Sequence, residues 1–168
     1  MKQVTASVLI QADLQTVWET MVNISRYSDW NPFIIHVGSA SDFPHPGTLM
    51  TFTVCWDNGA TQSTKELVDF IAPPSPTSGM QRAEWGYSFS GFLSKIGMVR
   101  AQRVQTLTAT PEGHTLYHTV ETFRGWGQLF LPLKKVQNGF DRQAEALKTV
   151  CEHHVEASLP SHDPRSMS

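Results

Sequence analysis

The chain has 168 residues, of which 40% are hydrophobic and 17% charged, a balance typical of one globular domain with a well-formed core. Its 13 basic and 15 acidic residues give a formal net charge of −2, so the overall composition carries no electrostatic footprint for nucleic acid or an anionic membrane. No apolar run approaches the roughly 20 residues that a membrane-spanning helix needs, and the start MKQVTASVLIQAD lacks the apolar core of a signal peptide. Because the chain also has only two cysteines, we expect a cytoplasmic protein without a disulfide framework.

The N-terminal segment predicts one strand followed by two short helices. Residues 2–12 are rich in β-branched side chains, and the run closes at Asp13, a good helix N-cap. The apolar residues of the next stretch recur at helical spacing and predict a helix over 14–22: Leu14, Val17, Trp18, Met21 and Val22. A further helical turn or two, ISRYSDW, ends before Pro32 because the residue before a proline avoids the helical region.

The stretch Trp30-Asn31-Pro32-Phe33 lies where the short helices give way to strands. Pro32 marks a hinge between the two kinds of structure. Trp30 and Asn31 then have two interpretations: an apolar wall and an orienting amide at the rim of a binding site, or a core plug and a turn cap.

The middle of the chain has the alternating pattern of strands separated by turn-rich segments. Asn58-Gly59 is the strongest local hairpin signal among these turns. With the N-terminal strand, the pattern predicts seven mostly antiparallel strands, six of them at about 33–40, 48–56, 62–71, 80–89, 99–109 and 115–123.

One long amphipathic helix closes the domain, from Pro132 to about residue 156. Its apolar positions recur at intervals of three and four: Leu133, Val136, Phe140, Ala144, Leu147 and Cys151. A sheet of seven strands must curl, and this helix offers the apolar stripe that covers the concave face. We therefore expect a single α+β domain over 1–157, with a cavity between sheet and helix, and a disordered tail over 158–168.

Several stretches of the sequence resemble the START-like, or SRPBCC, superfamily, in particular its polyketide cyclase/dehydrase-like branch. They are VWETMVNISRYSDWNPFI, RAEWGYSFSG, VETFRGW and GFDRQAEALK. In order and spacing they cover roughly residues 3–156. The resemblance implies the helix-grip fold, in which a curved antiparallel sheet wraps around a long C-terminal helix and two short helices follow the first strand. Two positions depart from the pattern: Gln102 stands near an expected histidine, and Ala144 stands where an asparagine is often found.

Glu121 is the most informative single residue, in a strand that also holds Tyr117 and Phe123 on the same face. If that face is concave, burial raises the pKa of the carboxyl group, as a general acid or base working near neutral pH requires. The alternative is an ion pair with Arg103 on the outer face. Tyr117 would be a neutral hydroxyl partner for a substrate carbonyl.

Arg103 has two possible orientations, because both faces of its strand are mixed. An outward, solvated arginine is the default, since arginine is rarely buried. An inward Arg103 would bind a substrate carboxylate or enolate through its planar guanidinium.

The candidate substrate-binding residues are mainly aromatic side chains expected along the cavity: Trp30, Asn31, Phe33, Phe52, Trp85, Phe123, Trp126 and Phe140. The Gly-punctuated apolar stretch 90–99 is either a lid over the cavity mouth or an ordinary packed connection. No metal-ligand spacing, phosphate-binding loop or dinucleotide fingerprint occurs, so no cofactor or metal is expected.

Two functions remain open from the sequence. One is a cofactor-independent cyclase or dehydratase that acts by general acid–base catalysis on a polyketide-like or similar lipophilic intermediate, with Glu121, Tyr117 and Arg103 as catalytic residues. The other is a non-catalytic carrier of a small hydrophobic ligand. Both take a small hydrophobic molecule as partner and neither involves nucleic acid or a membrane span; the oligomeric state stays open.

Overall fold

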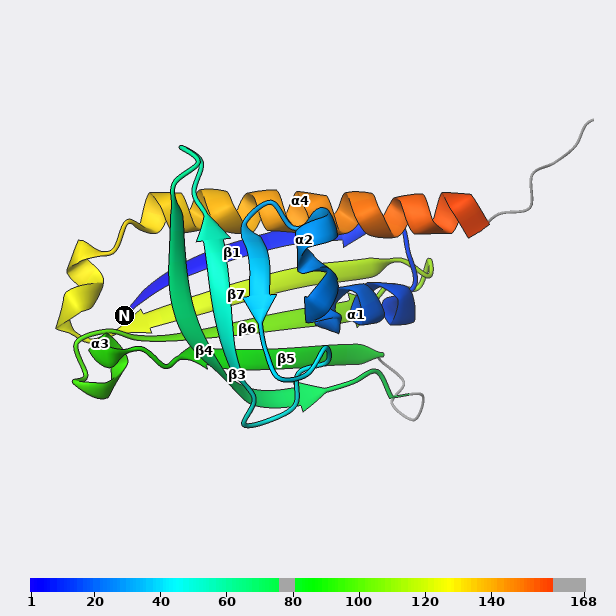
Figure 1. The fold of residues 1–168 in the computed structure, drawn as a ribbon. Coiled ribbons are helices and arrows are strands. Elements are labelled where there is room, and N and C mark those ends of the chain that lie inside the picture. The colour runs from blue at the N-terminus through cyan, green and yellow to red at the C-terminus, as the bar shows by residue number, and fades with distance from the viewer. Residues whose placement is uncertain (76–80, 159–168) are drawn as a thin grey trace, which may run out of the picture.

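A seven-stranded antiparallel sheet curves around one long helix in the computed structural model, which describes residues 1–75 and 81–158 (Figure 1). The strands follow the spatial order β1-β7-β6-β5-β4-β3-β2, so that each strand after β2 lies beside its predecessor in the chain and β1 closes the order beside β7. Their bounds are β1 (Lys2–Ile10), β2 (Ile34–Gly38), β3 (Leu49–Cys55), β4 (Thr61–Ala72), β5 (Arg82–Phe89), β6 (Arg100–Ala109) and β7 (Thr115–Arg124). The predicted helix-grip α+β architecture is thereby confirmed.

The helices also lie close to where the sequence predicts them. The Asp13 side chain accepts a hydrogen bond from the Thr16 amide at 3.0 Å and so caps the first helix. Helices and 3-10 turns are α1 (Leu14–Val22), η1 (Ile24–Arg26), α2 (Tyr27–Trp30), α3 (Phe92–Lys95), η2 (Trp126–Phe130) and α4 (Leu133–Ser158). The predicted tail at 158–168 lies outside the described residues except for Ser158, which ends α4. No helix of the described residues is long and apolar enough to span a membrane.

Strand alternation assigns one residue in two to the concave face. In β3 the buried positions are Met50, Phe52 and Val54, while the residues between them are more accessible. The antiparallel pairing of β6 with β7 sets Arg103 directly opposite Glu121, so both side chains leave the sheet on the same face. That face is the inner one, because its other positions in both strands are buried.

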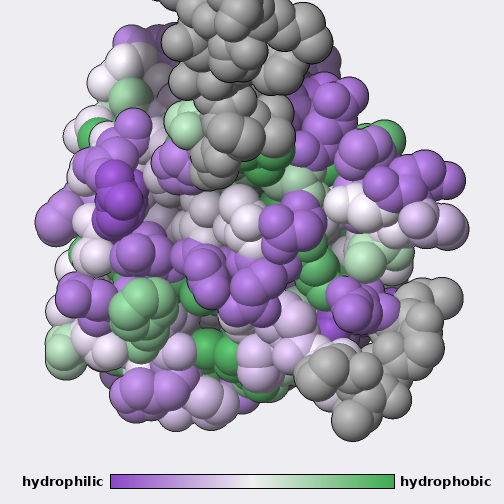
Figure 2. Space-filling model, turned by 90° about the vertical axis from the view of Figure 1, so that its right-hand side faces the viewer, coloured by the Kyte–Doolittle hydropathy of each residue, from purple (hydrophilic) through white to green (hydrophobic). Residues whose placement is uncertain are grey.

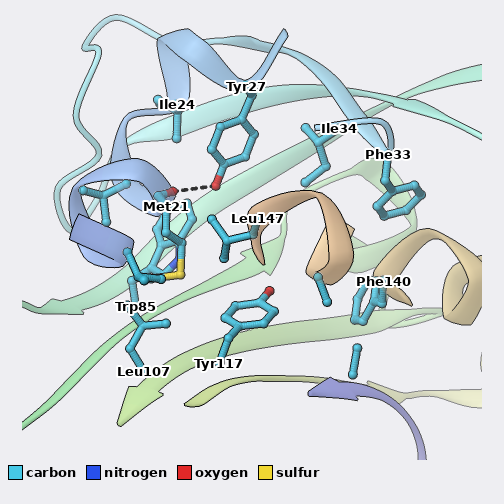
Figure 3. Close-up of a cluster of buried hydrophobic side chains, with 14 of the residues drawn as sticks. Met21, Ile24, Tyr27, Phe33, Ile34, Trp85, Leu107, Tyr117, Phe140 and Leu147 are labelled. Carbon is cyan, nitrogen blue, oxygen red and sulfur yellow. Dashed lines mark hydrogen bonds between the residues drawn. The ribbon is translucent and has the colours of Figure 1, made fainter. Parts of the chain in front are cut away.

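The two halves of α4 do different things. Leu147 and Cys151 in the C-terminal half are fully buried in the main core. Figure 3 shows Leu147 among side chains of the sheet and of α1, with the Tyr27 hydroxyl donating to the Met21 carbonyl at 2.7 Å. The N-terminal half of α4 instead lies over a space that side chains do not fill completely.

Gly139 of α4 permits a close contact between this helix and Phe33. A Cβ atom added at Gly139 would lie 2.4 Å from the Phe33 ring, which is 4% exposed. The ring also meets Phe140 at 6.1 Å between centroids, in an edge-to-face arrangement (Figure 3). A side chain at position 139 would therefore push Phe33 away from the helix.

Replacing Gly139 with alanine should lower the free energy of unfolding by about 1–3 kcal/mol, because overpacking at the Phe33 ring outweighs the gain in helix propensity. Urea denaturation measures the change. In a Phe33→Ala background the same substitution should instead stabilise the protein by up to about 1 kcal/mol. If Gly139→Ala stabilised the protein with Phe33 still in place, this result would contradict the close contact between position 139 and the Phe33 ring.

Candidate functional site

A cavity of about 190 Å³ lies between the concave face of the sheet and the N-terminal half of α4. This volume is smaller than the roughly 300–1,000 Å³ typical of drug-sized ligand pockets. Most of its lining is apolar, and six polar side chains interrupt this lining: Gln62, Thr64, Glu66, Tyr87, Arg103 and Glu121. The space suits a ligand of one or two rings rather than a long folded chain.

Arg103 is the central polar group of this site and is only 3% exposed. The guanidinium donates four hydrogen bonds to neutral oxygens. They run from Nε to Thr119 Oγ1 (2.9 Å), from Nη1 to Gln143 Oε1 (3.1 Å) and Tyr87 OH (3.3 Å), and from Nη2 to Tyr117 OH (3.4 Å). The structure thus places Arg103 on the inner face, and not in the outward orientation that is the default for this residue type.

The positive charge of Arg103 is not in contact with a carboxylate of the described residues, since none lies within 4.0 Å of its nitrogens. Its Cζ atom lies 3.7 Å from the centroid of the Phe140 ring, a cation–π contact that supplies part of the missing stabilisation. A guanidinium has five N–H hydrogens, and one on Nη2 has no acceptor in this part of the chain. Arg103 lines the cavity with one N–H hydrogen that no described residue accepts.

Glu121 is the first carboxyl group of the site. It lines the cavity and keeps some accessible surface there. Burial raises its pKa to about 7, and the nearby charge of Arg103 partly opposes this rise. A carboxyl group with this pKa exchanges a proton near neutral pH.

Glu66 in β4 is a second carboxyl group in the same cavity, and the sequence analysis missed it. Burial raises its pKa to about 8, and repulsion from Glu121 adds to the rise. Hydropathy would have placed Leu67 inside, but Leu67 is 38% exposed and Glu66 8%. The one sequence signal for an inward Glu66 is its position two residues before Val68, on the same face of the strand. An irregularity in the pairing with β5 between Val68 and Phe70 makes the inward and outward faces of β4 hard to assign from sequence.

The two carboxyl groups form a coupled pair. Burial raises the pKa of each carboxyl above the usual glutamate range, and the charge of Glu121 raises the pKa of Glu66 further. Both carboxyl groups line the same largely apolar cavity as the Arg103 cation.

The other predicted site residues fall into two groups. Phe33, Phe52, Phe123 and Phe140 line the cavity. Tyr117 lies beneath the lining, where its hydroxyl donates to Gln105 Oε1 at 2.7 Å and accepts from Arg103. Tyr117 therefore holds Arg103 in position and does not line the cavity.

Four predicted residues lie away from the cavity lining, and any role for them in binding stays a prediction. Trp85 is fully buried in the core beside Tyr87. Asn31 Oδ1 accepts from the Phe33 and Ile34 amides at 3.0 and 2.9 Å, so its amide stabilises the turn after α2. Trp30 packs on Tyr27 near the outer surface, with ring centroids 5.1 Å apart. Trp126 is 64% exposed.

Metal binding finds no support in the described ranges, 1–75 and 81–158. They contain no group of three or more histidine, cysteine, aspartate or glutamate side chains that could ligate an ion.

Comparisons with known proteins bear on the fold. No protein-family model and no curated protein matches the sequence. Solved structures do match, at low sequence identity. A hypothetical protein from Helicobacter pylori has a TM-score of 0.66 and 12% identity, with 89% of this chain and 88% of that chain covered. A norcoclaurine synthase mutant from Thalictrum has a TM-score of 0.63 and 10% identity, with 92% of this chain and 96% of that chain covered.

A third similar structure is the di-domain ARO/CYC protein BexL from the BE-7585A biosynthetic pathway. Its TM-score is 0.60 at 13% identity, and the match covers 95% of this chain and 51% of that chain. These likenesses confirm the helix-grip fold, which the sequence resemblance implied. A norcoclaurine synthase and an ARO/CYC protein share this fold.

The pH dependence of stability follows from the two raised pKa values. A carboxyl whose pKa is higher in the folded state binds more protons there, so the free energy of unfolding should fall as the pH rises from about 4.5 through 7 and 8. Urea denaturation across this range measures the slope. Glu66→Gln should flatten it, whereas Glu145→Gln on the exposed side of α4 should leave it unchanged. A wild-type stability that rises with pH over this interval would contradict the buried pair.

Proposed function

We propose that this protein is a cofactor-independent acid–base catalyst that acts on a small, largely apolar carbonyl compound, in a reaction of the cyclase or dehydratase type. The observation that carries the proposal is the placement of two carboxyl groups with raised pKa values in the same apolar cavity as a buried arginine without a counter-ion.

The size of the cavity narrows the substrate class. About 190 Å³ favours a molecule of one or two rings over an extended polyketide chain. Among similar structures, norcoclaurine synthase is described in complex with dopamine and hydroxybenzaldehyde, which are single-ring compounds. BexL supplies the precedent of an ARO/CYC function on this fold. Both similar structures support the proposal only through the shared fold, since their sequences are 10–13% identical to this chain.

The proposed reaction begins at a carbon next to a carbonyl group. Ionised Glu121 removes a proton from that carbon, and the electron pair of the broken C–H bond forms an enolate. The enolate oxygen accepts a hydrogen bond from Nη2 of Arg103, and the guanidinium charge stabilises the developing negative charge. The apolar walls exclude water and so strengthen both interactions.

Protonated Glu66 completes the reaction in one of two ways. In a dehydration it donates its proton to a departing hydroxyl group, and water leaves as the double bond forms. In a ring closure the enolate carbon attacks a second carbonyl of the same molecule, and Glu66 protonates the resulting alkoxide. In both cases Glu121 ends protonated and Glu66 ionised, so a proton passed from Glu121 to Glu66, through solvent, restores the starting state.

Binding without catalysis is the second candidate function, and the mostly apolar lining favours it. A carrier needs the cavity and the cation of Arg103 but no proton transfer. In this case the ligand would be a small hydrophobic molecule with one carboxylate or phenolate, and the raised carboxyl pKa values would be a by-product of burial.

Hydrogen exchange at carbon tests the catalytic proposal without knowledge of the substrate. Wild-type protein should accelerate exchange of the methyl hydrogens of acetophenone in deuterated water, followed by NMR. Glu121→Gln should slow this exchange by about 10²–10⁴-fold because the base is lost. Glu145→Gln is the matched control and should behave as wild type.

Two results would contradict catalysis. One is equal exchange by wild type and Glu121→Gln. The other is binding of acetophenone without any exchange, which would favour the carrier function.

Arg103→Met tests the anion-binding part, which both candidate functions share. At about pH 6, below both carboxyl pKa values, wild type should bind benzoate more tightly than benzyl alcohol. The substitution should weaken benzoate binding by about 10–100-fold and leave benzyl alcohol binding nearly unchanged. Calorimetric titration measures both ligands, and an equal loss for the two would show that Arg103 acts only through packing.

A further inference from the structure

Two segments beside the cavity pack together at one end of the molecule and form what we call the collar, residues 91–100 and 124–135. The Gly127 amide donates to the Met98 carbonyl at 2.9 Å. Gly125 has φ 92°, and a Cβ atom there would lie 2.5 Å from the Met98 carbonyl oxygen. The collar contains α3 and η2, which lie near the N-terminus in Figure 1.

The collar concentrates exposed apolar side chains. The described residues include twelve large hydrophobic side chains that are exposed, and six of these belong to the collar: Phe92, Leu93, Ile96, Trp126, Leu129 and Phe130. Trp126, Leu129 and Phe130 are each more than 60% exposed. An apolar patch of this kind on a folded protein indicates an interaction surface.

The collar also concentrates positive charge. Its 22 positions contain five exposed cations and no acidic residue: Lys95, Arg100, Arg124, Lys134 and Lys135. The remainder of the chain has eight basic against 15 acidic residues. The net charge of −2 therefore conceals a segment of +5 and a remainder of −7, a separation that the overall composition does not reveal.

The opposite end of the molecule has a different character. Figure 2 views the end where α1 and the C-terminal part of α4 lie, and its surface is mainly hydrophilic with scattered hydrophobic residues. Among the described residues, three of the four exposed aromatic side chains, Phe92, Trp126 and Phe130, belong to the collar, and the fourth is Phe43.

We propose that the collar docks on the surface of a bilayer that contains anionic phospholipids. Exposed Trp, Phe and Leu side chains enter the boundary between headgroups and acyl chains, and lysine and arginine bind the headgroup phosphates. Leu93 and Leu131 belong to the collar and also line the cavity, so docking brings this side of the cavity to the bilayer. This inference does not depend on the chemistry inside the cavity.

A second copy of the chain is a poorer occupant than a bilayer. Two collars face to face would bring five cations against five cations with no acidic residue between them. A surface of negative phosphates removes that repulsion.

Vesicle flotation tests the proposal with the full chain. Wild type should float with vesicles of phosphatidylcholine mixed with phosphatidylglycerol, and much less with phosphatidylcholine alone. Lys134→Gln with Lys135→Gln should weaken partitioning about thirtyfold, and Trp126→Ser with Phe130→Ser at least about tenfold. Raised salt should weaken binding of wild type through screening.

Matched control variants carry the same changes outside the collar. They are Lys65→Gln with Lys148→Gln, and Phe43→Ser with Leu116→Ser, and both pairs should partition as wild type. Circular dichroism confirms that every variant is folded.

Three outcomes would overturn the proposal. They are absence of wild-type binding to the mixed vesicles, equal binding to phosphatidylcholine alone, and collar variants that bind as wild type. Sedimentation equilibrium adds a fourth: a dimer that Trp126→Ser dissociates, without vesicle binding, would assign the collar to a second copy.

Discussion

The rest of the structure depends on keeping the Arg103 guanidinium charged in an apolar interior without a carboxylate in contact. Burying such a charge is costly unless its hydrogens are accepted by nearby atoms. Here the acceptors come from three separate elements: Tyr87 of β5, Thr119 and Tyr117 of β7, and Gln143 of α4. The same interaction therefore fixes the sheet relative to the helix that covers it. Because all four acceptors are neutral oxygens, the positive charge of Arg103 is not neutralised by them. A carboxylate in contact with the guanidinium would neutralise it.

The carboxyl groups follow from the same arrangement. Pairing between β6 and β7 sets Glu121 opposite Arg103, near enough for the cation to oppose the rise in the Glu121 pKa but outside ion-pair distance. Glu66 lies in β4, where repulsion from Glu121 adds to the effect of burial. One cation thus faces two carboxyl groups, and ionisation of the first makes ionisation of the second harder. Two chemically identical groups thus both have raised pKa values, for causes that differ: Arg103 opposes the rise at Glu121, and Glu121 adds to the rise at Glu66.

The sequence predicts the fold well because the fold depends on periodicity. Helical spacing in 14–22 and alternation in the strands are local signals, and the buried residues Leu147 and Met50 follow them. The site is harder to predict, because strand faces depend on register and a one-residue irregularity reverses them. Glu66 is inside and Leu67 outside against their hydropathy. Arg103 is inside because four partners distant in sequence accept its hydrogens, and no local pattern contains that information.

The division of α4 links the site to the molecular surface. Its C-terminal half completes the core through Leu147 and Cys151, so the cavity can form only under the N-terminal half, beside Val136 and Phe140. That half begins at the collar, and the cavity therefore shares two lining leucines, Leu93 and Leu131, with the apolar, basic end of the molecule. An apolar ligand dissolves more readily in a bilayer than in water. A cavity entrance held at the bilayer surface would let such a ligand reach Arg103 with little of its apolar surface exposed to water on the way.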